Sequence, residues 1–473
     1  MSPAASENLL DLSVAELGAK IRSKEITPTL LAEASLARIE RLDPQLHAFA
    51  TVTRDLALRQ ARDAESDLAA GRDRGPLHGI PFGAKDLVAT AGIRTTWGAK
   101  PYADQVFSYD ATVIRKLREA GAVLVGKCAM IELAGGMGYD IAGASLTGAA
   151  RNPWDTGRWT CGSSSGSGAA VAARIVPLAI GSETWGSIVC PASFCGVTGL
   201  RPTYGRVSRR GAMALSWTMD KLGPLARSAA DCEILLEAMA GPDPDDPTSV
   251  DEPLGPAIDI KKAARFRVGV LRAEPPKKFD VAIGKAFDAA IDDLKRAGVT
   301  IEEIKFPEIP IEEAAWIIIV AEGAAAFEPL FDSGRVRMLA DPGAPLAYPA
   351  SRLVLASDYL KAMRIRTVAQ NSMADLFAKY DAVVGLGVPS TAPPVEGKLS
   401  EYLSGADPLG GAGNLCGLPG LSVPCGFGSD GLPVGLVFMT GAFEERKALG
   451  LGKLYQSVTD WHTLKPPIIS KAA

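Results

Sequence analysis

The order of strand-like and helix-like segments restricts the fold of this chain more than any other feature of its sequence. After residue 80, short apolar runs such as Val123-Leu124-Val125 and Val268-Gly269-Val270-Leu271 alternate with segments of helical periodicity, such as 281–296. Apolar runs that lack polar alternation are typical of strands covered on both faces. We therefore predict an α/β fold with a mostly buried, mixed or parallel sheet.

The same patterns predict the other elements. Two helices are expected over residues 9–45, the first opened by the capping box Ser13-Val14-Ala15-Glu16, and a third over 54–70. Segments 241–247 and 388–413 are rich in turn residues, and the first is either a domain boundary or a surface turn. The remaining predicted strands are 80–88, 178–180, 300–306, 382–384, 421–423 and 434–437, and the remaining helices are 111–120, 169–175, 311–329, 356–379 and 443–458.

Charge and hydropathy exclude several classes of protein. A formal net charge of −4 gives no reason to expect a surface that binds nucleic acid. The apolar run 316–321 is too short to span a bilayer and is followed by Glu322. The N-terminus has neither the basic region nor the apolar segment of a signal peptide. We expect a cytoplasmic protein that binds neither nucleic acid nor a membrane.

The cysteines and histidines lack the spacing of a metal site or a disulfide framework. There are seven cysteines, an odd number, at irregular spacings and without a CxxC motif. The three histidines form no HExxH or HxH pattern. We expect free thiols in a reducing compartment, no bound metal and a mechanism without histidine.

Lys85, Ser163 and Ser187 follow one another in segments that suit catalysis. A lysine acts as a base only when its charge is suppressed, and a serine attacks only when a base takes its proton. Desolvation would lower the pKa of Lys85 if the side chain were buried, whereas a salt bridge to Asp86 would be the ordinary alternative. Ser187 is either a plain loop serine or a nucleophile at a tight turn that presents backbone N–H groups.

The tract Gly162-Ser163-Ser164-Ser165-Gly166-Ser167-Gly168 allows three interpretations. Its composition is typical of a flexible linker. The helix predicted directly after it favours instead a tight turn at a helix N-terminus. The tract also matches G-x-S-x-G, the nucleophile motif of α/β-hydrolases, in which Ser164 would attack and His462 would complete a triad.

A longer set of motifs surrounds these serines between residues 75 and 224. It comprises Gly75-Pro76-Leu77-His78-Gly79-Ile80-Pro81, Glu119-Ala120-Gly121-Ala122-Val123-Leu124-Val125-Gly126-Lys127, Arg151-Asn152-Pro153-Trp154-Asp155, the serine tract and Gly196-Val197-Thr198-Gly199-Leu200-Arg201-Pro202-Thr203-Tyr204-Gly205. Similar motifs return over 414–425 and 431–436. In this order they resemble the amidase signature family, and the separation of 24 residues between Ser163 and Ser187 agrees with the family's register.

The resemblance implies an enzyme that cleaves a carboxylic amide through a serine acyl-enzyme and needs no cofactor. Ser187 would be the nucleophile, Ser163 the bridging serine, held by a cis peptide bond after Gly162, and Lys85 the base. Ser164 would support the lysine. The implied oxyanion hole consists of backbone N–H groups on one short loop: Thr184, Trp185, Gly186 and Ser187.

The resemblance also implies the architecture and the ligand. We expect a single large α/β domain with a mixed, mostly parallel central sheet flanked by helices. Residues 1–70 would form a helical arm packed on the core, and 71–473 the amidase signature domain, with 245–400 as its variable substrate-pocket region. The predicted substrate contacts are Gly136, Met137 and Trp185. The expected ligand is a small-molecule amide, with an aryl amide, a carbamate or an ester still open, and a homodimer is the family-level expectation.

Departures from the family pattern leave further alternatives. Trp185 stands where the family usually has a glycine, and its indole would lie either in the pocket or in the core. The chain also resembles the A subunit of glutamyl-tRNA(Gln)/aspartyl-tRNA(Asn) amidotransferase, which needs partner subunits, and Asp407 falls where that subunit keeps an acid. The altered loop at 185–190 favours a stand-alone amidase. A non-catalytic binding or scaffold protein is disfavoured, because all three catalytic positions are present.

Overall fold

An eleven-stranded sheet runs through the centre of the protein, in the order β1-β3-β2-β6-β8-β7-β12-β13-β11-β9-β10, and a separate ribbon pairs β4 with β5. The structure is a computed structural model and describes residues 8–272, 279–403 and 406–471. The strands are β1 Phe49–Val52, β2 Pro81–Lys85, β3 Val123–Cys128, β4 Arg151–Asn152, β5 Asp155–Trp159, β6 Leu178–Glu183, β7 Thr198–Arg201, β8 Lys221–Ala226, β9 Arg267–Leu271, β10 Thr300–Ile304, β11 Ala382–Leu386, β12 Gly420–Phe427 and β13 Pro433–Met439.

The strand pairing makes this a mixed sheet. Its parallel pairs lie in the groups β3-β2-β6 and β11-β9-β10. The strands from β6 to β11 pair antiparallel, as does β1 with β3. The predicted single α/β domain with a large mixed sheet flanked by helices is confirmed.

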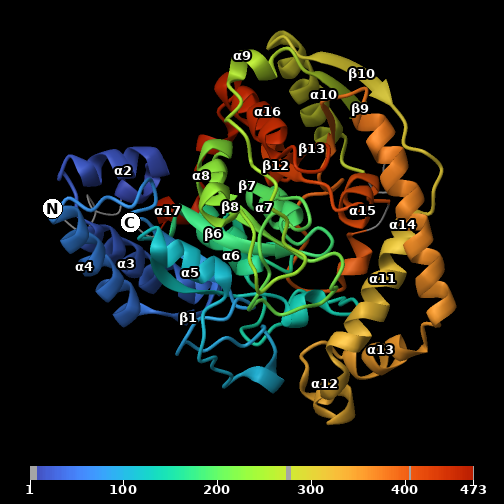
Figure 1. Cartoon of the computed structure of the whole chain (residues 1–473), viewed down its shortest axis with the longest axis horizontal. Coiled ribbons are helices and arrows are strands. Elements are labelled where there is room, and N and C mark those ends of the chain that lie inside the picture. Colours follow the sequence, from blue (N-terminus) through green and yellow to red (C-terminus); the bar gives the residue numbers. More distant parts are fainter. Residues whose placement is uncertain (1–7, 273–278, 404–405, 472–473) are drawn as a thin grey trace.

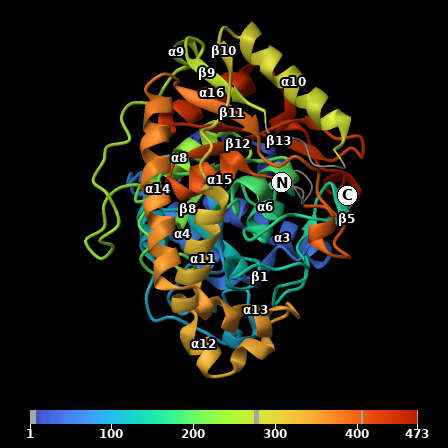
Figure 2. The same cartoon turned by 90° about the vertical axis from the view of Figure 1, so that its right-hand side faces the viewer.

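Helices cover the sheet and extend beyond both of its ends. In Figure 1, α2 to α4 lie at one end of the molecule and α11 to α14 at the other, and Figure 2 shows α11 and α14 side by side. No helix within the described ranges is long and apolar enough to cross a membrane. The α-helices are α2 Val14–Arg22, α3 Pro28–Leu46, α4 Arg54–Ala69, α5 Thr112–Glu119, α6 Ser165–Ala172, α7 Val189–Cys195, α8 Ala229–Met239, α9 Ile260–Ala263, α10 Val281–Arg296, α11 Ile311–Ala326, α12 Glu328–Asp332, α13 Ala344–Ala350, α14 Ala356–Phe377, α15 Pro408–Leu415, α16 Glu445–Val458 and α17 Ile468–Lys471.

Burial explains why the apolar runs form strands. All residues of β2, β3, β6, β8 and β13 are buried, because helices lie on both faces of the sheet. The helix starts also follow the local sequence. Ser13 closes the predicted capping box with Glu16 at the start of α2, and Thr27 caps α3 ahead of Pro28.

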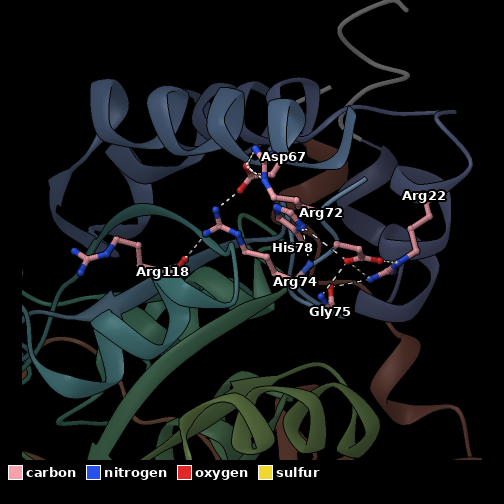
Figure 3. A network of polar contacts seen from close by, with 8 residues as sticks. Arg22, Asp67, Arg72, Arg74, Gly75, His78 and Arg118 are labelled. Atoms are coloured by element: carbon pink, nitrogen blue, oxygen red, sulfur yellow. Dashed lines mark hydrogen bonds and ion pairs between the residues drawn. The ribbon is translucent and has the colours of Figure 1, made fainter. Parts of the chain in front are cut away.

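Arginine side chains tie the N-terminal helices to the body of the protein (Figure 3). Asp67 of α4 accepts hydrogen bonds from Arg72 and Arg74, and Arg74 also donates to the backbone carbonyl of Arg118 at 3.4 Å. Arg22, the last residue of α2, donates to the backbone carbonyl of Gly75 at 2.7 Å. The network joins α2, α4 and α5 through the segment that leads into β2. The division of the chain at residue 70 stays a prediction.

Several elements were not predicted from the sequence, among them β1, β7, β8, α7, α8 and α15, and two of these go against the local residue preferences. The region 388–413, predicted as turns, contains the start of α15, whose N-cap is Asp407. β8 was not expected, because Gly223 and Pro224 disfavour a strand. It forms all the same between β6 and β7, where Pro224 pairs with Ile180 in an antiparallel register. The turn-rich segment 241–247 lies within the single domain and is fastened by Asp243, which accepts a hydrogen bond from Ser208 at 2.6 Å.

Candidate active site

Lys85 ends β2 with its ammonium group inside a cluster of hydroxyl groups. The side chain is fully buried. Its Nζ lies 2.7 Å from Ser163 Oγ, 3.0 Å from Ser164 Oγ and 2.9 Å from Ser182 Oγ. The neighbouring strand β6, parallel to β2, supplies Ser182. The alternative, a salt bridge between Lys85 and Asp86, does not form. Asp86 instead accepts a hydrogen bond from the backbone N–H of Thr96 and pairs with Lys127.

Burial controls the charge of this lysine. It lowers the pKa of Lys85 well below its usual 10.5, and the carboxylates of Asp220 and Glu183 oppose that shift only in part. No carboxylate among the described residues forms an ion pair with Lys85. A lysine in such surroundings can be neutral and accept a proton, which is the property that a general base requires.

The serine tract is a tight turn that leads into α6. The peptide bond between Gly162 and Ser163 is cis, as the family resemblance implied. Ser164 Oγ donates to the backbone carbonyl of Ser182 at 3.1 Å and accepts from the backbone N–H of Ser182 at 3.2 Å. The tract is therefore built into the site, and the linker interpretation is wrong.

Ser187 lies on a short loop between β6 and α7 and lines a cavity. The loop turns at Gly186, whose φ is 77°. Among the described residues, no acceptor takes a hydrogen bond from the backbone N–H groups of 184–187, so these groups are free to bind an oxyanion. Ser164 N–H donates to the Ser187 carbonyl at 3.3 Å and ties the two segments together, but no hydrogen bond joins the hydroxyls of Ser163 and Ser187 in the described part of the chain.

Glu183 anchors this loop, and sequence reasoning did not identify it. One carboxylate oxygen accepts from the backbone N–H groups of Ile188 and Val189 at 2.8 and 3.0 Å. The other accepts from Arg201 and Asn414 at 2.8 and 2.9 Å. Burial alone would raise the pKa of Glu183, but Arg201, Lys221 and the backbone N–H of Val189 together outweigh it, and the pKa falls to about 2. The signal in the sequence was its place directly before the loop.

Asp220 is a second carboxylate that sequence reasoning missed. It accepts from the Thr184 hydroxyl at 2.6 Å and from the backbone N–H groups of Leu215 and Ser216 at 2.8 and 3.0 Å. Burial raises the pKa of Asp220. Asp220 thus holds Thr184, the first residue of the loop that carries Ser187.

The cavity that Ser187 borders has a volume of about 500 Å³. Gly136 and Trp185 line it, whereas Met137 does not. The sulfur of Met137 packs instead against α11, where a Cβ on Gly323 would lie 2.8 Å from it. That these residues contact a substrate stays a prediction. Among the described lining residues only Arg201 and Asp407 are charged, and most of the wall is apolar: Leu215, Trp316, Ile319, Leu403, Leu409 and Val437.

The alternative triad of Ser164 and His462 is wrong. The Ser164 hydroxyl is engaged with Lys85 and Ser182, and neither Ser164 nor His462 lines the cavity. His462 lies after α16, in the short 3-10 helix Trp461–Thr463. A matching G-x-S-x-G motif was not sufficient, because the backbone here places Ser164 beside the lysine.

A disulfide between Cys161 and Cys190 joins the start of the serine tract to the helix that follows Ser187. Cys161 directly precedes Gly162, and Cys190 lies in the first turn of α7. The expectation that all the cysteines are free is wrong for this pair, because the fold brings together segments whose spacing in the sequence shows no pattern. The other five, Cys128, Cys195, Cys232, Cys416 and Cys425, are buried and free.

Removal of this disulfide is expected to destabilise the protein. The bridged residues are 29 positions apart, and closing a loop of that length contributes about 3.6 kcal/mol in the chain-entropy model. Denaturant unfolding of a Cys161→Ala/Cys190→Ala variant should show a loss of that size against the oxidised parent. Dithiothreitol should destabilise the parent in the same way and leave the variant unaffected. An equal response of both proteins to the reductant would contradict the prediction.

Comparisons with known proteins give matches over nearly the whole chain. The Amidase family model matches residues 31–449. The A subunit of the glutamyl-tRNA(Gln) amidotransferase of Methylococcus capsulatus is 39% identical, over 96% of this chain and 98% of that protein. The crystal structure of native peptide amidase from Stenotrophomonas maltophilia is 32% identical with a TM-score of 0.84, over 94% of this chain and 96% of that one. The A subunit of the glutamyl-tRNA(Gln) amidotransferase of Thermotoga maritima is 29% identical with a TM-score of 0.75, over 97% of each chain.

Proposed function

The chain belongs to the amidase family of enzymes that act on amide C–N bonds, and on that premise we propose that it cleaves carboxylic amides through an acyl-enzyme on Ser187. The observation that carries the proposal is a fully buried lysine 2.7 Å from the hydroxyl of Ser163, beside a loop of unpaired N–H groups that ends at Ser187. A suppressed charge makes Lys85 a base, and the free N–H groups offer a place for developing negative charge.

The proposed reaction begins with neutral Lys85. Ser187 turns its hydroxyl towards Ser163 and passes its proton to that oxygen, while Ser163 passes its own proton to the lysine. Ser187 Oγ attacks the amide carbonyl, and the N–H groups of the 184–187 loop bind the oxyanion. The tetrahedral intermediate collapses as the lysine returns a proton through Ser163 to the leaving nitrogen, because an amide anion is a poor leaving group. Water then releases the carboxylic acid by the same relay.

The cavity wall supports an apolar acyl substituent. Trp316 and Ile319 from α11 and Leu409 from α15 face the cavity, together with Trp185 beside the nucleophile. The guanidinium of Arg201 is buried and its charge is paired with Glu183, although its Nη2 makes no hydrogen bond among the described residues. We propose small amides with an uncharged, apolar acyl group as substrates of the isolated chain.

A second candidate is the amide-cleaving component of a tRNA-dependent amidotransferase. The names of the curated relatives support this candidate more directly than a stand-alone hydrolase, at 39% identity over 96% of the chain. In that role the same acyl-enzyme would form from glutamine, and the released ammonia would pass to partner subunits. Arg201, the one cation among the described cavity residues, is already paired with Glu183, and this weighs against glutamine, whose α-carboxylate needs a positive partner.

Labelling with a fluorophosphonate, followed by peptide mass spectrometry, tests the nucleophile. We expect the adduct on Ser187 and none in a Ser187→Ala variant that retains its thermal midpoint. An adduct on Ser164, or an unlabelled wild-type protein, would contradict the proposed mechanism.

Ammonia release by the purified chain separates the two candidates. Release from hexanamide without any partner supports the stand-alone hydrolase. A protein that is labelled at Ser187, releases no ammonia from hexanamide and accepts glutamine supports the amidotransferase component.

A further inference from the structure

Trp185 places a large side chain between the oxyanion loop and the wall of the cavity. The indole is half-buried, and its Nε1 donates a hydrogen bond to Asp407 Oδ2 at 2.9 Å. Its ring packs against α15, where a Cβ on Gly411 would lie 3.7 Å from Cζ2. Both Trp185 and Asp407 line the cavity that Ser187 borders. The residue that the chain carries in place of the family's usual glycine therefore faces the substrate.

Asp407 is held in place by the backbone rather than by a cation. Its Oδ1 accepts from the Gly410 N–H at 2.9 Å and caps α15, and its own N–H donates to Glu312 at 3.0 Å. Gly410 is required, because a Cβ there would lie 1.9 Å from Oδ2. No lysine or arginine of the described residues forms an ion pair with Asp407. The indole N–H is thus the side-chain donor that occupies Oδ2.

We propose that Trp185 determines substrate specificity: its indole, held by Asp407, reserves the acyl side of the cavity for uncharged substituents. The inference rests on the proposed amide cleavage at Ser187. An α-amino amide would bring an ammonium group to Asp407, the one carboxylate among the described lining residues, and that carboxylate already binds the indole. Binding such a substrate would require the ammonium group to displace the Trp185 N–H and move the ring.

The chemistry of the pair predicts what happens when the indole N–H is lost. A carboxylate oxygen without a donor in a mostly apolar cavity attracts a cation strongly, since charge-assisted hydrogen bonds exceed neutral ones. In a Trp185→Phe variant an aromatic ring remains, although a smaller one, and Asp407 Oδ2 loses its indole donor. Such a variant should accept substrates with an ammonium group that the parent rejects.

Hexanamide and norleucinamide test the inference, because the two amides share a six-carbon acyl chain and differ by the α-ammonium group. The parent is expected to prefer hexanamide in kcat/KM. In Trp185→Phe the ratio of kcat/KM for norleucinamide over hexanamide should rise about tenfold. The double variant Trp185→Phe/Asp407→Asn should lose that gain, since the amide carries no negative charge to bind the ammonium group.

The outcomes separate this inference from the proposed function. An unchanged ratio in Trp185→Phe, with Ser187 still labelled by a fluorophosphonate, would overturn the role of Trp185 and leave the mechanism intact. A rise that persists in the double variant would likewise overturn it, because the gain would then come from space rather than from Asp407. A parent that neither cleaves hexanamide nor is labelled at Ser187 would overturn both.

Discussion

Replacement of Lys85 by methionine is expected to lower kcat for amide cleavage by about 10⁴-fold, the upper range of general-base contributions. The fully buried ammonium group contacts the hydroxyls of Ser163, Ser164 and Ser182, and the described residues show no other base near Ser163. Methionine has a similar length and fills the space, but it cannot take a proton. Steady-state ammonia release from hexanamide measures the effect.

The stability and pH dependence of this variant provide the controls. Burial lowers the pKa of Lys85 below its unfolded value of 10.5, so the folded state loses stability relative to the unfolded state as the pH falls below 10.5. Lys85→Met removes that cost, and its thermal midpoint at neutral pH should equal or exceed that of the parent. The parent's kcat/KM should rise with pH as Lys85 loses its proton, and the residual activity of the variant should lack that rise. A variant with near-parental kcat would contradict the assignment of Lys85 as the base.

Replacement of Arg201 by methionine is expected to lower the free energy of unfolding by about 3–5 kcal/mol, the usual cost of leaving one buried charge unpaired. Arg201 donates to Glu183 at 2.8 Å and to the Leu418 carbonyl at 3.0 Å, and both charged side chains are almost completely buried. The guanidinium of Arg201 fits here only because residue 413 is a glycine: a Cβ at that position would lie 1.9 Å from it. Urea unfolding at neutral pH measures the loss.

A double variant and a pH series distinguish an unpaired charge from a packing defect. Arg201→Met/Glu183→Gln should recover part of the lost stability, because neither member of the pair is then left charged without its partner. In the parent, the ion pair stabilises the fold above the ordinary glutamate pKa of 4.5, and this contribution is lost as the pH falls towards about 2. In Arg201→Met the free energy of unfolding should change less over this pH range than it does in the parent. Equal losses in the single and double variants would contradict the ion-pair explanation.

Much of the fold could be predicted from periodicity, because helix and strand patterns are local properties. The predicted helix 281–296 coincides with α10, and the capping box at Ser13 forms as expected. The strand β8 and the helix α15 escaped prediction, since Gly223, Pro224 and the glycines of 409–413 carry the wrong local preferences. Tertiary contacts decide both: β8 is enclosed by two strands, and the glycines of α15 make room for Asp407 and Arg201.

The candidate catalytic residues could be identified from the sequence, but the residues that hold them in position could not. Lys85, Ser163 and Ser187 lie in short motifs with a recognisable order, so a resemblance could pick them out. Glu183 and Asp220 accept hydrogen bonds from backbone N–H groups four to six residues away, and no motif marks such contacts. The disulfide and the Trp185–Asp407 hydrogen bond join residues that are far apart in the chain, and only the fold brings them together.

The enclosure of Lys85 restricts how protons travel during turnover. Its Nζ has no contact with solvent and meets three serine hydroxyls and one backbone carbonyl. A proton taken up by this amine can therefore leave only through those hydroxyls, towards the bound substrate. While Lys85 holds the proton, the proton would not exchange with bulk water. Within one turnover the proton that leaves the attacking serine would be the same proton that reaches the departing nitrogen. The site would work as a closed proton carrier, and buffer acids and bases would have no catalytic effect on acylation.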